Sequence, residues 1–321
     1  MKNLKKINVV CFGGGTGLPS LLRGLKTIPE LNLTAVVNMF DTGGSSGELR
    51  DKFGILPPGD ILKCLLALAE DDASARKILL KRIRHDEHPG HTGGNVLLMG
   101  LEKVYGDYLD AVNALGQILS IRGRVLPITL TQGTLCAMYK DGFISKGEVN
   151  VDAHLFDGRE VEKLFLEPHV EASTEAKEAI RAADVLCVGP GSFYTSVISN
   201  FLPKGVKESI ISSKAPIIFI CNLLTEGLGM RNHTVASVVN SLEQYLGRGV
   251  SAVIVNTKVP EKKVLERYAA ERKHPLLPNV ANLGKLDPLI VPDDLWLDSG
   301  IARHDSERLA HLVFSVVNRV I

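Results

Sequence analysis

The sequence predicts an α/β protein built around one mainly parallel β-sheet with a single ligand crevice. Apolar strands alternate with helices at both ends of the chain, and two of these strands run directly into glycine-rich turns. With 321 residues, of which 45% are apolar, the chain can bury a large core. The carboxyl ends of parallel strands lie at one edge of a sheet, so polar residues that follow several strands are expected to line the same crevice.

The first glycine-rich turn follows an apolar strand expected over 7–12. Pro19 suits the first turn of the helix that comes next, since it has no N–H to leave unpaired. The glycines allow positive φ, and the free N–H groups at the start of the helix favour an anion such as a phosphate. The spacing matches neither the dinucleotide fingerprint nor the P-loop, and a turn without a ligand is the alternative. The ligand contacts expected here are Gly13, Gly14, Gly15, Thr16, Gly17 and Leu18.

A second strand, expected over 33–39, ends just before Asp41. This carboxylate could contact a ribose or hold a metal ion, or it could form a turn with its own backbone. A run of small residues follows and offers a second anion cradle, with Arg50 close enough in sequence to reach a phosphate. The contacts expected from this run are Gly43, Gly44, Ser45 and Ser46. Asp60 is expected to cap a helix that ends at Leu68.

Helices are expected next over 73–84, from after Asn95 to about Val104, and over 108–119. The first is basic and amphipathic, which is typical of a solvated face. The second follows another start made of small residues, where His91 and Asn95 are candidate ligand contacts.

The middle of the chain has the alternating pattern and the turn residues of antiparallel β-structure. Strands are expected over 124–129, 134–139 and 144–151, with a hairpin turn at 141–142. We therefore expect a β-rich insertion over about 123–170 within a single domain that covers 1–321, because no linker sets the insertion apart.

The second glycine-rich turn follows a helix expected over 174–183 and a strand expected over 184–188. Its glycines and hydroxyl groups at the start of a helix suit a nucleotide phosphate. A serine-nucleophile elbow is not expected, because Tyr194 stands where that motif needs glycine. The contacts expected here are Gly189, Gly191, Ser192, Tyr194 and Thr195.

Further βα units complete the pattern towards the end of the chain. A strand expected over 216–221 leads into Asn222, which is another candidate contact, and a strand expected over 250–256 precedes a charged helix over about 261–272. A last helix is expected after Asp305.

Charge and composition disfavour binding to nucleic acid or to a membrane. Lys and Arg number 37 against 36 Asp and Glu, a formal net charge of +1, so no overall field favours nucleic acid or an anionic membrane. No apolar segment approaches the length of a membrane span, and we expect a cytoplasmic protein with a small-molecule ligand. The five cysteines show no paired spacing and are expected to be reduced and buried.

Six segments together resemble the YvcK-type gluconeogenesis factors of the CofD-like (2-phospho-L-lactate transferase-like) superfamily. They are GGGTGLPSLLRGLK at 13–26, DTGGSSGELR at 41–50, PPGDILKCLLALA at 57–69, GHTGGN at 90–95, GPGSFYTS at 189–196 and RHD at 303–305. The resemblance implies a Rossmann-like three-layer α/β/α core in one CofD-like domain. It also implies a ligand of the UDP-N-acetylglucosamine type and a regulatory role in cell shape and envelope synthesis during gluconeogenic growth. Tyr268 and Arg303 would contact the uridine and the sugar.

The resemblance to CofD itself implies a second function, the Mg²⁺-dependent transfer of 2-phospho-L-lactate to a deazaflavin. That reaction needs a carboxylate for the metal, and Asp41 is the catalytic and metal candidate. This chain has Thr42 where relatives usually have a second Asp, and GLGMRNH at 227–233 where they are acidic, which favours a non-catalytic regulator. An NAD-binding oxidoreductase is the weakest alternative. GDP or NAD as the ligand, a homodimer and protein partners in envelope synthesis stay open.

Overall fold

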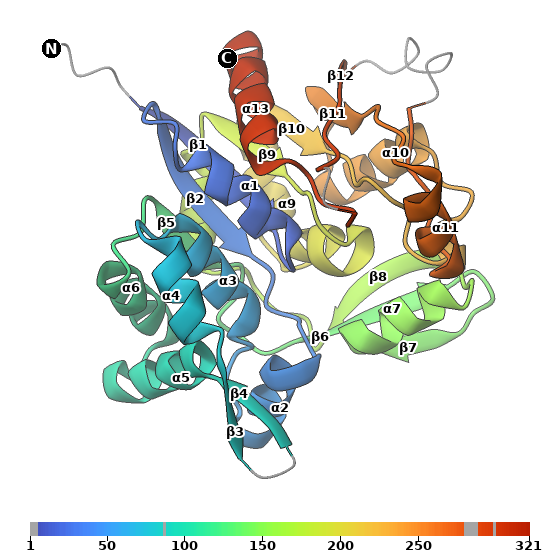
Figure 1. Ribbon diagram of the computed structural model, residues 1–321. Helices are drawn as coiled ribbons and strands as arrows, with labels where there is room; N and C mark the ends of the chain where they lie inside the picture. Colours follow the sequence, from blue (N-terminus) through green and yellow to red (C-terminus); the bar gives the residue numbers. More distant parts are fainter. Residues whose placement is uncertain (1–5, 86–87, 279–287, 298–299) are drawn as a thin grey trace, which may run out of the picture.

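The computed structural model describes residues 6–85, 88–278, 288–297 and 300–321. Its centre is a seven-stranded sheet in the order β12-β11-β10-β9-β1-β2-β5, in which every neighbouring pair is parallel (Figure 1). The predicted α/β class with a mainly parallel sheet is therefore confirmed. The strands are β1 (Ile7–Gly13), β2 (Leu31–Val37), β5 (Arg124–Pro127), β9 (Val185–Val188), β10 (Ile217–Ile220), β11 (Ala252–Asn256) and β12 (Leu289–Asp293).

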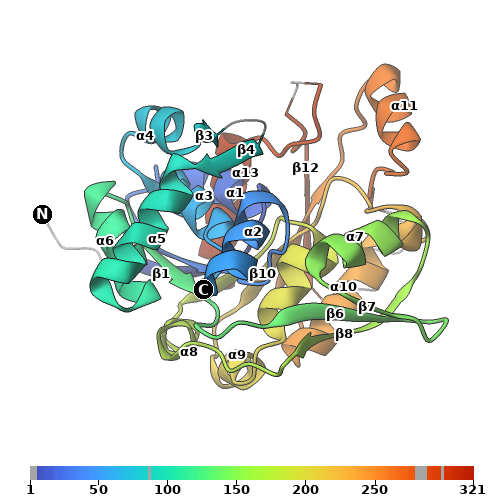
Figure 2. The same ribbon diagram turned by 90° about the horizontal axis from the view of Figure 1, so that it is seen from below.

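Helices cover both faces of this sheet, as the three-layer prediction requires (Figure 2). One layer contains α1 (Gly17–Leu25), α3 (Gly59–Leu68) and α13 (Ser306–Val320), and the other contains α8 (Thr174–Arg181), α9 (Val206–Ser212) and α10 (Val235–Leu246). Four more helices lie towards the ends of the sheet, α4 (Asp72–Leu79), α5 (Gly93–Tyr105), α6 (Tyr108–Ile118) and α11 (Lys262–Ala270). The sequence patterns did not predict α9, α10 or β12.

The strand order reverses at the centre of the sheet. β1 lies between β2 and β9, so the chain builds outward from β1 in one direction to β5 and later from β9 in the other direction to β12. Loops that leave neighbouring strands on opposite faces open a crevice at such a switch point, and ligands of open α/β sheets bind there. The two glycine-rich turns follow β1 and β9, and both therefore lie at this point.

Helix α1 is held at the switch point by its packing on α13. Leu18, Leu21 and Leu22 on its inner face are fully buried, and their removal from water stabilises the helix on the sheet. Gly24 allows the close approach, because a Cβ there would lie 2.1 Å from the carbonyl oxygen of Ser306. The start of α1 is thus fixed by a helix at the opposite end of the chain.

The antiparallel insertion is a separate small sheet and begins later than expected. Its strands, in the order β7-β6-β8, are β6 (Thr134–Tyr139), β7 (Ile144–Lys146) and β8 (Val161–Glu167). The segment expected as its first strand is β5, which pairs in parallel with β2 in the main sheet instead.

The strand expected over 144–151 was half wrong. It stops at Lys146, and helix α7 (Glu148–Phe156) follows Gly147, whose φ of +91° turns the chain out of the strand. Val151 and Leu155, one helical turn apart, are buried and hold α7 in place. The alternating polar and apolar residues at 148–151 are compatible with a strand as well as with a helix. The packing of the whole segment determines that it is a helix.

The region between α3 and α5 also differs from the prediction. The helix expected over 73–84 ends at Leu79, because the chain from Arg82 pairs with Thr92 in a hairpin, β3 (Arg82–His85) and β4 (His88–Thr92).

The segment between β2 and α3 differs from the prediction as well. The run of small residues after β2 forms the unpredicted helix α2 (Gly44–Phe53). Asp60 is not the N-cap of α3, which is Pro58, because its carboxylate is engaged elsewhere.

Candidate functional site

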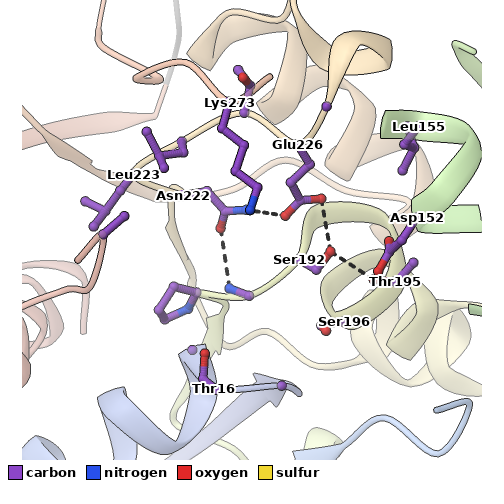
Figure 3. A pocket seen from close by; sticks show the side chains of 18 of the residues that line it. Thr16, Asp152, Leu155, Ser192, Thr195, Ser196, Asn222, Leu223, Glu226 and Lys273 are labelled. Carbon is purple, nitrogen blue, oxygen red and sulfur yellow. Dashed lines mark hydrogen bonds between the residues drawn. The ribbon is translucent and has the colours of Figure 1, made fainter. Parts of the chain in front are cut away.

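A cavity of about 640 Å³ opens at the carboxyl ends of β1, β9 and β10 (Figure 3). Figure 3 shows Thr16 of the first turn on one side of it and Glu226 and Lys273 on the other. Helix α7, the loop after β10 and the chain just before α13 close the remaining sides. The lining residues are Gly15, Thr16, Gly17, Glu148, Asp152, Leu155, Phe156, Pro190, Gly191, Ser192, Thr195, Ser196, Asn222, Leu223, Leu224, Thr225, Glu226, Gly227, Tyr268, Lys273, Ala302 and His304.

The two glycine-rich turns touch each other in the floor of the cavity. A Cβ at Gly17 would lie 2.2 Å from the carbonyl oxygen of Pro190, so only glycine fits at this contact. Two buried asparagines fix the arrangement: the amide of Asn38 donates to the Thr195 carbonyl at 3.0 Å, and that of Asn200 donates to the Ser196 carbonyl at 2.7 Å and the Gly13 carbonyl at 3.3 Å. The prediction that both turns face one crevice is confirmed.

The first turn bends at Gly15, whose φ is +62°, and then enters α1. The Gly15 N–H donates to the carboxylate of Asp60 at 2.6 Å, and Lys63 pairs with the same carboxylate at 2.8 Å. Thr16, the exposed N-cap, makes no side-chain cap bond. The first N–H groups of α1 have no partner within the helix, and with the helix dipole they present a positive end to the cavity.

The second turn does not lead into a regular α-helix as the first turn does. After Gly189, with φ +79°, the chain forms a single π-turn (Phe193–Val197) and a short 3₁₀ helix (Ile198–Phe201) instead of the expected α-helix. The Gly191 N–H donates to the side-chain oxygen of Asn222 at 3.4 Å, and the Thr195 hydroxyl donates to the Ser192 hydroxyl at 2.9 Å. The Ser192 hydroxyl and the Phe193 N–H both donate to Glu226.

Helix α7 brings two carboxylates to the cavity wall, Glu148 and, one turn later, Asp152. Glu148 accepts a hydrogen bond from the Thr42 N–H at 3.3 Å, and Asp41 accepts one from the Gly43 N–H at 2.7 Å. Burial, and then the neighbouring charge of Asp41, raises the pKa of Glu148 to about 8. A second carboxyl group thus lies beside Asp41 and comes from α7, more than a hundred residues along the chain.

The far side of the cavity combines an aromatic ring with basic groups. Tyr268 is buried, and its hydroxyl accepts a hydrogen bond from the Ala302 N–H at 2.6 Å. Lys273 points into the cavity (Figure 3), and its ammonium group pairs with Glu271 at 3.1 Å. Burial lowers the pKa of His304 to about 4, so this imidazole is neutral at physiological pH.

The structure gathers only part of the predicted site. The predicted residues that line the cavity are Gly15, Thr16, Gly17, Gly191, Ser192, Thr195, Asn222 and Tyr268. Others support its floor from beneath, namely Gly13, Gly14, Leu18, Gly189 and Tyr194, all of them buried. Arg303 is exposed, between the lining residues Ala302 and His304. Asp41 lies next to Glu148, behind the wall.

The remaining predicted contacts belong to a separate network around α2. The Ser45 hydroxyl lies 2.9 Å from Nδ1 of His91 and accepts from the amide of Asn95 at 3.2 Å. Arg50 donates to the Gly133 carbonyl at 3.1 Å and the Thr134 hydroxyl at 2.9 Å, away from the cavity. The others of this group, Gly43, Gly44 and Ser46, lie at the start of α2 and outside the cavity lining as well.

Sequence reasoning missed the ionisable groups of the cavity, namely Glu148, Asp152, Glu226, Lys273 and His304. The four-residue spacing of Glu148 and Asp152 was a usable signal, but it was hidden by the assignment of that segment to a strand. Nothing local marks Glu226. Within the described residues no group of three or more His, Cys, Asp or Glu side chains is arranged to hold a metal ion, and no helix there is long and apolar enough to cross a membrane.

The comparisons with known proteins agree with one another. A family model described as 2-phospho-L-lactate transferase CofD matches residues 9–296. The chain is 35% identical over 314 residues to a "Gluconeogenesis factor" of Halalkalibacterium halodurans, covering 97% of this chain and 96% of that one. It is 32% identical over 317 residues to the "Gluconeogenesis factor" of Bacillus subtilis, covering 98% and 99%. A crystal structure of a UPF0052 family protein from Bacillus halodurans has a TM-score of 0.91 at 34% identity, covering 97% of this chain and all of that one.

Proposed function

We propose that this chain, which belongs to the CofD family, binds a nucleoside diphosphate sugar in the cavity and acts as a regulator without a catalytic step of its own. The observation that carries the proposal is the position of the start of α1. Its N–H groups face a cavity at the switch point of a parallel sheet, which is where α/β proteins bind nucleotides. The ligand we propose is of the UDP-N-acetylglucosamine type.

The diphosphate would bind at Thr16 and Gly17. The positive end of the α1 dipole favours an anion there, and the carboxylate that accepts from this turn, Asp60 of α3, is already paired with Lys63. The absence of side chains at Gly15 and Gly17 lets phosphate oxygens approach the backbone.

The uridine and sugar would lie across the cavity from α1. Tyr268, Leu223 and Leu224 supply an apolar wall for a ring, and exposed Arg303 is next to this wall and could reach a polar group on the ligand. Glu148 and Asp152 supply acceptors for sugar hydroxyl groups.

The names of the two relatives support a role in gluconeogenic growth, which we extend to cell shape and envelope synthesis through protein partners in the cytoplasm. A regulator of this kind needs only that the ligand change the surface offered to a partner. The proposed function therefore requires tight, selective ligand binding and does not require catalytic turnover.

A second candidate is a Mg²⁺-dependent phosphoryl-group transferase, and one observation favours it. Glu148 lies beside Asp41, so two carboxyl groups are close together, and the first of them lines the cavity. Mg²⁺ is usually held by one or two carboxylates together with substrate phosphates. If such a metal bound, it would neutralise charge on the transferred group, and Asp41 and Glu148 would hold it.

Thermal shift with a panel of ligands tests the proposal. At a concentration about a hundred times the Kd, the ligand should raise the free energy of unfolding by about 2.7 kcal/mol, and hence Tm by about 5 °C or more. UDP-N-acetylglucosamine should give this shift, with UDP, GDP and NAD weaker. Release of UMP from the same ligand in the presence of Mg²⁺ would support the transferase, because transfer of the sugar phosphate to an acceptor hydroxyl group or to water leaves UMP. A panel without any shift would refute nucleotide binding.

A further inference from the structure

The second glycine-rich turn is already occupied by a carboxyl group of the protein itself. Both carboxylate oxygens of Glu226 lie 3.0 Å from the N–H of Phe193, and one of them accepts from the Ser192 hydroxyl at 3.0 Å. The other accepts from the side-chain amide of Asn222 at 3.2 Å (Figure 3). These three donors are of the kind that would hold a phosphate oxygen.

The backbone that carries this carboxylate is held firmly in place. Gly227 has φ +63°, and a Cβ there would lie 2.4 Å from Cα of Phe156, so the loop packs directly against α7. On the other side, the Thr225 N–H donates to the His274 carbonyl at 2.7 Å and its hydroxyl accepts from the His274 N–H at 3.0 Å. Glu226 is therefore placed against the turn by two elements distant in sequence.

We propose that Glu226 is a positioning residue that serves as the built-in acceptor of the second turn, ordering its donors and restricting the ligand's phosphates to the first turn. This inference rests on the proposed function only for the identity of the ligand. It assigns different tasks to two turns that look alike in sequence: the first binds the diphosphate, and the second, with Glu226, forms a rigid wall for the uncharged part of the ligand.

The charges around the second turn support this division. Burial, and then the neighbouring charge of Asp152, raises the pKa of Glu226 to about 8, and this carboxyl group is mostly ionised only above that pH. Of the lining residues only Lys273, which also pairs with Glu271, brings an opposing positive charge. A phosphate placed at the second turn would meet both carboxylates at short range, whereas hydroxyl groups of a sugar would find acceptors there. At the first turn, by contrast, Asp60 is neutralised by Lys63.

Chemical rescue tests the proposal. In Glu226→Ala, the turn donors lose their carboxylate, and a small carboxylate such as formate should take its place. We expect Glu226→Ala to bind UDP-N-acetylglucosamine about tenfold more weakly, and about 0.1 M sodium formate, but not sodium chloride at equal ionic strength, to recover at least half of the loss in affinity and in Tm. The measurements are made at about pH 8.5, where formate is ionised and most wild-type molecules carry an ionised Glu226.

Two further variants make the result decisive. Glu160→Ala removes a carboxylate that pairs with the exposed Lys140, and it should show no response to formate beyond that to chloride. Glu226→Gln keeps an acceptor for Phe193 and should lose less affinity than Glu226→Ala, which also covers the case in which the alanine variant does not fold. Equal responses of Glu226→Ala to formate and chloride, or tighter ligand binding by that variant, would overturn the proposal.

Failure of the proposed function gives a different outcome. If the wild type binds no nucleotide, the formate-dependent rise in the Tm of Glu226→Ala still tests whether the turn holds an anion. If the wild type binds the nucleotide but formate does not act on Glu226→Ala, only the role of Glu226 is refuted.

Discussion

The two glycine-rich turns of this protein follow neighbouring parallel strands and touch each other, yet they differ in what their donors do. The turn after β1 leads into a regular α-helix and shares one N–H with Asp60, whose charge Lys63 balances. The turn after β9 leads into a π-turn, and Glu226 takes its Ser192 and Phe193 donors. A glycine-rich βα turn thus offers donors that can bind an anion. The rest of the fold determines whether a ligand or a side chain of the protein accepts from these donors.

The strongest test of the comparison is a side chain placed in the first turn. Gly15→Val should weaken nucleotide binding at least a hundredfold, about 2.7 kcal/mol, because the side chain occupies the space of the phosphates and φ +62° disfavours a β-branched residue. Isothermal titration measures this loss. Gly44→Val has a similar φ of +47° with nothing within 4 Å, and it should keep the affinity. Equal losses in both variants would show that backbone strain, not phosphate contact, is responsible.

The contact between the turns predicts a loss of stability. Gly17→Ala would place a Cβ 2.2 Å from the Pro190 carbonyl oxygen, and the forced shift should lower the free energy of unfolding by about 2 kcal/mol. Denaturant titration measures the change. Gly100→Ala, also in a helix but with nothing within 4 Å, should be neutral or stabilising, since alanine favours a helix. A Gly17→Ala variant as stable as Gly100→Ala would show that the turns are not in fixed contact.

The carboxyl groups of α7 in the cavity wall predict that the nucleotide affinity depends on pH. The pKa of Glu148 is about 8, so this carboxyl group gains charge as the pH rises through 8 and then repels the ligand's diphosphate. The wild-type affinity should therefore fall with rising pH, and Glu148→Gln should bind about fivefold more tightly than wild type at about pH 9, or ~1 kcal/mol. Titrations at several pH values measure this difference. Binding that is equally pH-dependent in Glu148→Gln would assign the effect to another group.

The smallest effect is expected from Mg²⁺ and Asp41. On the regulator proposal, a chelator should change the nucleotide affinity by less than about threefold, or ~0.6 kcal/mol. Asp41→Asn should also bind normally, because an amide oxygen can still accept from the Gly43 N–H. Titration of both proteins with and without Mg²⁺ tests this. A tenfold loss on chelation that is absent in Asp41→Asn would favour the transferase, with Asp41 and Glu148 holding the metal.

The sequence by itself determined the class of the fold and the place of the site. Mainly apolar runs such as 7–12 and 184–188, each followed by glycines, favour buried strands. The glycines before Pro19 and Ser192 mark the turns that follow, because backbone freedom and a missing N–H act locally. These signals need no knowledge of distant residues. They therefore predicted β1, β9 and the meeting of the two turns at one edge of the sheet.

Only the tertiary structure decided which side chains face the cavity. Glu148 reaches Thr42 because α7 packs on the small sheet, and Glu226 meets Phe193 because its loop packs on α7. Ser45 and Arg50, which suited a phosphate equally well, hydrogen-bond to His91 and Thr134 instead. The direction of a polar side chain depends on partners brought close by the burial of apolar surface elsewhere, and sequence spacing carries no information about such partners.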